Sequence, residues 1–316
     1  MKLGSIVGIV LSCLLIISGI VLCARGRSMA EDSGQNLLVQ MNKGGTYYNQ
    51  KIDDSIKRIK IEYEDADIQI KGGASRSQIE FRNFNPNFYA MSVTSSIITF
   101  EETPRITSIT DIWENGFNFK GLRYALSYSN KDFEGLKKSV IISLADDTDI
   151  KNLDIIAVKG AVQLSNVNLD GDISISIRSG KIKINNLTSS SSLDISGNSV
   201  KSTIEEVNAP IFRYNVNKSD ADITNCIFTE STVNVNDGTV NYSTNDVLTN
   251  EFMSVSTEKG ILTVNTVLRT EPIKNSPTEF LKKLTISGTD VNINLTYPET
   301  PTDSVPEEGA DVSVTE

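Results

Sequence analysis

The chain has 316 residues, of which 39% are hydrophobic, so it is long enough to form one large domain or two with a sizeable core. Its formal net charge is −10, from 40 acidic and 30 basic residues, and no long cluster of lysine and arginine offsets that charge. We therefore expect no nucleic-acid partner. The absence of histidine excludes Ser-His-Asp and Cys-His catalytic sites and removes the commonest metal ligand. Glycine-rich phosphate loops are absent too, and we expect no cofactor.

Residues 3–24 are 22 uncharged, mostly aliphatic positions, enough for a helix of about 33 Å that crosses a bilayer. A cleaved signal peptide has a shorter apolar region of about 7–15 residues. The sequence therefore predicts an uncleaved transmembrane anchor over residues 1–27, with Lys2, Arg25 and Arg27 as flanking charges. The alternatives are a signal cleaved near "SMA" at residues 28–30 and a lipoprotein acylated at Cys13. The flanking charges do not decide the orientation, and we expect the C-terminal domain outside the cell by analogy with signal-anchor proteins.

Two polar segments enclose the remaining chain. Residues 28–50 show no periodic apolar pattern and are predicted to be a linker. Residues 298–316 contain six acidic residues, three prolines and no basic residue, and are predicted to be a disordered acidic tail because they cannot bury enough apolar surface to offset the entropy of ordering.

Residues 51–297 are dominated by short alternating strands that recur at a nearly constant spacing. Equivalent turn positions fall at Gly160, Gly180, Val200, Ser219, Gly238 and Gly260, in steps of 20, 20, 19, 19 and 22 residues. A strand precedes and follows each turn, as in "DISISI" and "KIKI". The segments "IKIEYEDADIQI" at 59–70 and "LKKLTISGTDVNINL" at 281–295 fit the same template.

This repeat predicts an all-β fold, a right-handed parallel β-helix-like solenoid with coils of about 20 residues. Alternation places Ile173, Ile175, Ile177, Ile182 and Ile184 inside and rows of Ser, Asn, Thr and Lys outside. Glycine suits the turns because it adopts positive φ, and Val200 indicates a different turn. A two-sheet β-sandwich is the alternative, since it also has turns every 8–12 residues.

Residues 71–150 break the pattern and hold eleven of the 21 aromatic residues. We expect residues 84–133 to be an aromatic-rich insert or cap, because the open end of a solenoid exposes its core. Aromatic faces also stack on sugars and peptides. Trp113, Phe117, Phe119 and Tyr124 are therefore a candidate ligand-contact patch.

Residues 140–187, "VIISLADDTDIKNLDIIAVKGAVQLSNVNLDGDISISIRSGKIKINNL", together with the opening unit "IKRIKIEYEDADIQIKG", resemble the bacterial "putative adhesin" family of β-strand-repeat proteins. The resemblance covers about residues 52–295 and depends on pattern rather than on fixed motifs. It implies a right-handed parallel β-helix-like fold behind an N-terminal anchor, chiefly in Gram-positive bacteria, and a link of some relatives to envelope stress. It supplies no catalytic residues, and the aromatic segment at 84–133 departs from the family pattern.

The remaining candidates for chemistry are carboxylate pairs, namely Asp146-Asp147-Asp149, Glu205-Glu206 and Glu101-Glu102. Adjacent residues on a strand point to opposite faces, so such pairs do not converge on one substrate atom, and we expect solvated surface charges. "ADDTD" at 145–149 lacks the spacing of a calcium loop. Cys226, unpaired in the folded part, is expected to be a small core residue.

The sequence thus predicts a membrane-anchored, extracytoplasmic, non-enzymatic protein for cell-surface adhesion or envelope-stress sensing. It would contact the membrane through residues 3–24 and bind a cell-wall, glycan, peptide or protein ligand. Two alternatives stay open. One is a polysaccharide-cleaving enzyme of the β-helix class, and the other is a passive spacer that holds the acidic tail away from the membrane.

Overall fold

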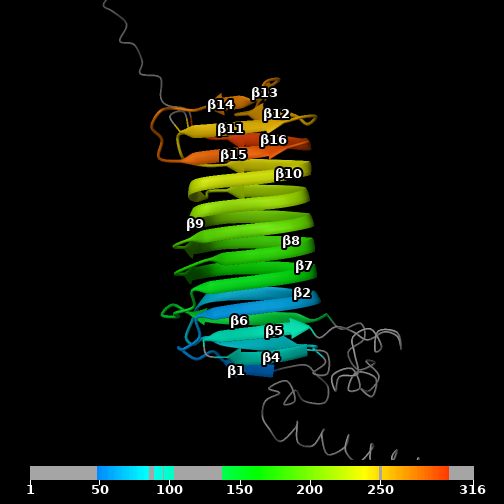
Figure 1. The fold of residues 1–316 in the computed structure, drawn as a ribbon, viewed down its shortest axis with the longest axis vertical. Helices are drawn as coiled ribbons and strands as arrows, with labels where there is room; N and C mark the ends of the chain where they lie inside the picture. The colour runs from blue at the N-terminus through cyan, green and yellow to red at the C-terminus, as the bar shows by residue number, and fades with distance from the viewer. Residues whose placement is uncertain (1–47, 85–88, 95, 103–136, 249–250, 299–316) are drawn as a thin grey trace, which may run out of the picture.

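The computed structural model describes residues 48–84, 89–94, 96–102, 137–248 and 251–298 (Figure 1). The described chain is all-β, and its sixteen strands belong to one sheet. They are β1 (Tyr48–Lys51), β2 (Arg58–Ala74), β3 (Gln78–Arg82), β4 (Tyr89–Thr94), β5 (Ile97–Glu102), β6 (Ser139–Ala145), β7 (Asn152–Leu169), β8 (Ile173–Ser189), β9 (Ser192–Thr224), β10 (Ile227–Ser243), β11 (Phe252–Thr257), β12 (Leu262–Val264), β13 (Val267–Arg269), β14 (Ile273–Asn275), β15 (Lys283–Gly288) and β16 (Asp290–Thr296). The predicted anchor lies outside the described residues, and none of the described residues forms a helix able to span a membrane.

The long central strands lie side by side in parallel, each about one repeat after its neighbour (Figure 1). Ile155 of β7 is in register with Ile175 of β8, and Ile175 with Ile195 of β9, so each offset equals one predicted repeat. Tyr214, further along β9, is in register with Val233 of β10, again one repeat later. The predicted repeat spacing is therefore confirmed across β7 to β10. This pairing is parallel, whereas a meandering sheet would pair consecutive strands antiparallel.

The strand order departs from the chain order near both ends. β2 lies directly on β7, although Ile61 and its register partner Ile155 are far apart in the sequence. At the other end β15 and β16 lie on β10, and β11 and β12 lie beyond them. The prediction that Gly260 directly follows Gly238 is therefore wrong, because Val291 is the register partner of Gly238. The alternation of polar and apolar residues determines which face of the sheet a residue occupies, but not which strand lies beside it. β11 and β12 carry the same alternation as β15 and β16, so the sequence does not show which of them pairs with β10.

Apolar side chains form continuous inner columns through the stack. One column joins buried residues of β5, β2, β7, β8 and β9, namely Phe100, Ile61, Ile155, Ile175 and Ile195. The predicted inward set, Ile173, Ile175, Ile177, Ile182 and Ile184, is confirmed, since each is at most 2% exposed. Burial of these side chains is the main stabilising contribution, about 1.5–3 kcal/mol for each fully buried aliphatic residue.

A polar cluster around Tyr214 lies within the apolar interior. Tyr214 is fully buried, and its hydroxyl lies 2.8 Å from the Ser202 Oγ and 2.6 Å from the Ser219 Oγ. The small Ser202 occupies an inward position in register with Ile182 of the neighbouring strand. Burial raises the pKa of the Tyr214 phenol, so the group stays neutral. Cys226 is buried as predicted, and burial raises the pKa of its thiol to about 11.

The chain turns at two sets of positions. In the first set Gly160, Gly180 and Gly238 are left-handed, whereas Val200 and Ser219 are not, so the different turn predicted at Val200 is confirmed. The predicted glycines Gly160 and Gly180 have φ of 133° and 149°, and a Cβ on Gly180 would lie 1.9 Å from the carbonyl oxygen of Gly160. The second set was not predicted. Asn166, Asn186 and Asn225 have φ of 53°, 53° and 54°, a conformation that asparagine tolerates better than most residues.

Antiparallel strands occupy the outer ends of the parallel stack. β3 pairs antiparallel with β1 and β6, and β4 with β5. At the other end β13 pairs with β12 and β14 with β11. These short hairpins cover the ends of the stack, where a parallel sheet would otherwise expose its core and a long unpaired edge.

Candidate binding surfaces

The predicted aromatic patch, Trp113, Phe117, Phe119 and Tyr124, lies outside the described residues, as does most of the segment 84–133. The described start of that segment contributes to the core. Phe84 is fully buried, and its ring centroid lies 5.9 Å from that of Phe81 and 5.3 Å from that of Phe100. These rings pack edge to face in the core, a favourable aromatic arrangement.

The acidic residues at 146–149 lie on the surface. Asp146 and Asp147 are exposed in the turn after β6, and Asp149 forms an ion pair with Lys57. The hydrogen bond from Lys57 lowers the pKa of the Asp149 carboxyl. Within the described ranges, no three Cys, Asp or Glu side chains come together in a way that could hold a metal ion.

The two glutamate pairs lie on β9 and at the end of β5. Glu205 accepts a hydrogen bond from the Asn185 Nδ2 at 3.2 Å, whereas Glu206 occupies a left-handed turn position with φ of 55°. Glu101 is exposed on β5, and Glu102 ends that strand. The hydrogen bond of Glu205 and the turn position of Glu206 give these two carboxylates different surroundings.

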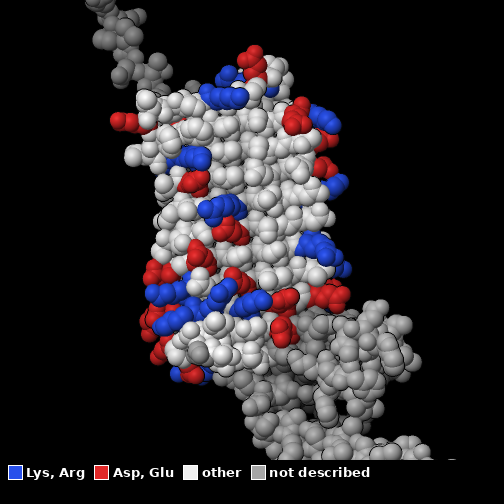
Figure 2. All heavy atoms as spheres, viewed as in Figure 1, with Lys and Arg blue, Asp and Glu red and all other residues white. Residues whose placement is uncertain are grey.

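A broad uncharged face runs along the stack on the side where β11 and β15 lie. Its central row consists of exposed or half-buried Ser176, Ser196, Asn215, Asn234, Ser287 and Ser256. Figure 2 shows this side, with charged side chains gathered toward its margins and its lower part. We call this surface the serine–asparagine face.

Asparagine side chains form hydrogen-bonded ladders from one strand to the next. At one margin of the serine–asparagine face the Asn217 Nδ2 donates to the Asn198 Oδ1, and the Asn236 Nδ2 donates to the Asn217 Oδ1, both at 3.1 Å. At another turn the Asn186 Nδ2 donates to the Asn166 Oδ1 at 2.9 Å. The sequence predicted rows of asparagine on the outside, and the structure adds the hydrogen bonds that join their side chains.

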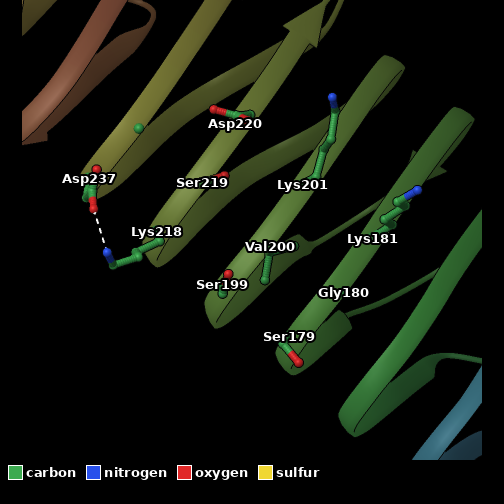
Figure 3. A pocket seen from close by; sticks show the side chains of 11 residues that line it. Ser179, Gly180, Lys181, Ser199, Val200, Lys201, Lys218, Ser219, Asp220 and Asp237 are labelled. Atoms are coloured by element: carbon green, nitrogen blue, oxygen red, sulfur yellow. Dashed lines mark ion pairs between the residues drawn. The ribbon is translucent and has the colours of Figure 1, made fainter.

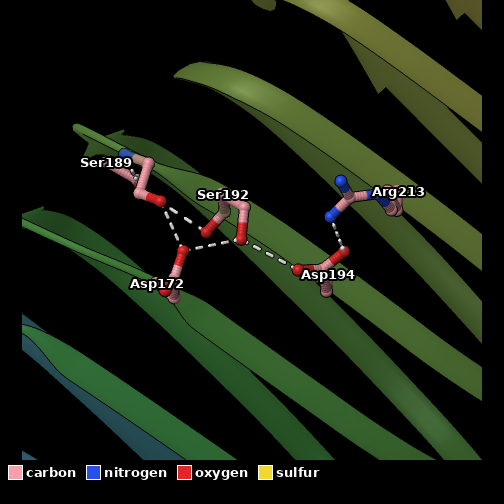
Figure 4. A network of polar contacts seen from close by, with 6 residues as sticks. Asp172, Ser189, Ser192, Asp194 and Arg213 are labelled. Carbon is pink, nitrogen blue, oxygen red and sulfur yellow. Dashed lines mark hydrogen bonds and ion pairs between the residues drawn. The ribbon is translucent and has the colours of Figure 1, made fainter.

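A network of serine and aspartate side chains lies at the corner between β8 and β9 (Figure 4). The Ser192 Oγ lies 2.9 Å from both the Asp172 Oδ1 and the Asp194 Oδ2, and Arg213 donates to Asp194 at 3.0 Å. Hydrogen bonds from Ser191 and Ser192 lower the pKa of the Asp172 carboxyl. These hydrogen bonds join the residue before β8 to the start of β9, so the network is suited to holding the corner.

An open trough of about 440 Å³ crosses the turn edge from β8 to β10 (Figure 3). Lys181 and Lys201 project from neighbouring strands in the same direction. Lys218 turns toward Asp237, and their side-chain atoms lie 2.8 Å apart. Asp220 also lines the trough. We call this surface the lysine trough, and sequence reasoning did not identify it.

Comparisons with known proteins give only distant likenesses. No family model and no curated protein matches the chain. A "putative cell adhesion protein" from Clostridium sporogenes aligns over 80% of this chain and 99% of its own length, with 11% identity and a TM-score of 0.33. A "putative adhesin" from Bacteroides fragilis covers 80% and 96%, with 12% identity and a TM-score of 0.37. One from Parabacteroides distasonis covers 80% and 98%, with 8% identity and a TM-score of 0.25. At these TM-scores the likeness does not establish a common fold or function.

Proposed function

We propose that the chain is a membrane-anchored, extracytoplasmic β-solenoid protein without enzymatic activity, which serves in cell-surface adhesion or in sensing envelope stress. The observation that carries this proposal is the register of the central strands, in which each strand pairs with the one that follows it by a single repeat. Equivalent outward positions therefore form long rows along the molecule. Repeat proteins commonly bind through such extended surfaces.

The solenoid interpretation is supported by the same register and by the inner columns. A chain that returned above its own start once per repeat would place each strand one spacing of about 4.8 Å above the last, in the register observed. The hydrogen-bonded asparagine ladders give the outer rows a fixed geometry. A fixed outer surface loses little conformational entropy when it binds a ligand.

The proposal is tested in cells that make the full chain, lack it, or make a form without the repeat at residues 173–192. We expect loss of the chain to reduce attachment to a surface or survival under cell-wall stress, and the full chain to restore it. Unchanged attachment and survival would count against both proposed roles.

Variants of the chain in these cells, and an assay of the purified chain, discriminate the alternatives. A passive spacer predicts that shortening the stack changes the phenotype, whereas changes to the outer rows do not. A polysaccharide-cleaving enzyme predicts release of reducing sugars by the purified chain and loss of that activity when Asp146, Asp147 and Asp149 are changed to Ala. If the proposal is correct, changes to the outer rows alter the phenotype, and the purified chain releases no reducing sugars.

A further inference from the structure

We propose that the lysine trough binds an anionic group, a phosphate or a carboxylate, carried on a linear extracellular polymer, with Lys181 and Lys201 as the residues that hold it. This inference deepens the proposed function and rests on it only for the location of the ligand outside the cell. The residues that would bind the anion line the trough, so binding itself does not depend on the proposed function.

The first argument is an unbalanced pair of charges. Lys181 of β8 and Lys201 of β9 are register partners on adjacent parallel strands, both exposed, and Lys183 projects to the same outer side two residues further along β8. Like charges placed opposite each other on neighbouring strands destabilise a sheet. Within the described part of the chain, neither Lys181 nor Lys201 forms an ion pair.

Elsewhere in the sheet, like-charged register partners have an oppositely charged side chain close by. Glu62 of β2 is the register partner of another glutamate, and it has Lys60 at 3.2 Å. Asp237 of β10 is the register partner of another aspartate, and it has Lys218 at 2.8 Å. The lysine pair in the trough therefore has no ion-pair partner among the described residues, whereas the fold supplies one to like-charged pairs at comparable positions. An external anion between the two ammonium groups would supply the missing charge.

The second argument is the shape and chemistry of the trough. The strand spacing of about 4.8 Å sets the separation at which the two lysine stems leave the sheet, close enough for both ammonium groups to reach one phosphate or carboxylate. Ser179 and Ser199 are register partners that line the trough two residues before the lysines, and the Ser179 hydroxyl donates to the Val158 carbonyl oxygen at 3.4 Å. The trough is open and crosses several strands, which suits a group on a chain better than an enclosed small molecule.

The overall charge of the chain does not oppose this assignment. Six of the ten excess negative charges lie in the tail at residues 298–316. Within the trough Asp220 follows Lys201 by 19 residues, one repeat, and forms no ion pair in the described part of the chain. Its carboxylate would repel the ligand from one side. Removing the charge of Asp220 should strengthen binding, whereas removing the charges of the lysines should weaken it.

The experiment measures binding of the purified full chain, held in nanodiscs of uncharged lipid, to linear polyphosphate, polygalacturonate and neutral dextran. We expect one of the two anionic polymers to bind, with an affinity that falls as salt is raised, and dextran not to bind. The double variant Lys181→Gln/Lys201→Gln should bind at least about tenfold more weakly, since each lost contact at about 4 Å in water is worth roughly a fivefold change. Asp220→Asn should bind more tightly.

The matched control is Lys259→Gln/Lys274→Gln, which removes the same charge from exposed positions outside the trough. It should leave binding within about twofold of the unchanged chain, because exposed charges beyond about 10 Å are screened at 0.1 M salt. Equal losses in both double variants, or no loss in Lys181→Gln/Lys201→Gln, would overturn the assignment. So would binding of anionic lipid vesicles without binding of either polymer. Thermal unfolding checks the fold, and removal of the repulsive pair should not lower the melting temperature. These outcomes are independent of where the domain lies in the cell.

Discussion

Ile175→Asp probes the interior of the stack more directly than any surface change. Ile175 is fully buried between its register partners Ile155 and Ile195. Truncating a buried isoleucine costs about 2–5 kcal/mol. An unpaired carboxylate in the same place adds several kcal/mol more, or takes up a proton instead. Since a whole domain is stable by only about 5–15 kcal/mol, the variant should lose a large part of its stability at neutral pH.

The pH dependence of that loss has a definite sign. Burial raises the pKa of the introduced carboxyl above its unfolded value of about 3.9. The folded state then binds more protons than the unfolded state, so stability falls as pH rises between the two pKa values, by about 1.4 kcal/mol per pH unit. The carboxylate penalty is therefore absent below about pH 4 and grows until the pH passes the raised pKa, whereas the penalty for lost packing is present throughout.

Urea unfolding of the purified full chain, followed by far-ultraviolet circular dichroism between pH 4 and 8, measures both effects. Ser176→Asp is the matched control, because it adds the same charge one residue along the strand on the outer face. We expect its urea midpoint to stay close to that of the unchanged chain, within about 0.5 kcal/mol in free energy. If Ile175→Asp and Ser176→Asp unfolded at the same urea concentration, the assignment of inner and outer faces would be refuted.

Three further changes test other parts of the structure. In Gly180→Ala the new Cβ would lie 1.9 Å from the Gly160 carbonyl oxygen, so urea unfolding should show a loss of more than about 1 kcal/mol, and an unchanged midpoint would contradict the close approach. Tyr214→Phe should cost about 1–3 kcal/mol by leaving two buried serine hydroxyls without their partner, and adding Ser202→Ala should recover part of this loss. For Cys226, whose thiol pKa is raised to about 11, we expect no reaction with a thiol reagent at pH 8 in the native state, so Cys226→Ser should lower labelling only in urea.

The sequence predicted the repeat well because two independent periods coincide in it. Alternation along each strand assigned the inner isoleucines such as Ile175 and Ile182, and the constant spacing of the turns assigned the register of β7 to β10. The order of the terminal strands was not predictable in the same way. β11 and β15 share one alternating pattern. The sequence therefore placed Gly260 in the repeat, but it did not show that Val291 rather than Gly260 lies beside Gly238.

Surface features were harder to predict than the core. Position within a strand shows that Lys181 and Lys201 point outward, but their lack of ion-pair partners emerges only when the register is combined with the positions of the acidic side chains. The outer rows of asparagine follow from the repeat itself and were predicted, whereas the hydrogen bonds within them depend on side-chain positions that the repeat spacing alone does not give. The aromatic patch around Trp113 stays a prediction, because it lies outside the described residues.

Exposure of the domain to the outside of the cell is the point on which both proposed roles depend. The most direct measurement is the addition of a protease to intact cells that carry the full chain with a C-terminal tag, followed by blotting for the tag and for a cytoplasmic control protein. We predict that the tag is removed while the cytoplasmic protein survives. A tag that survives in intact cells and is removed only after lysis would place the domain inside and contradict the proposed function.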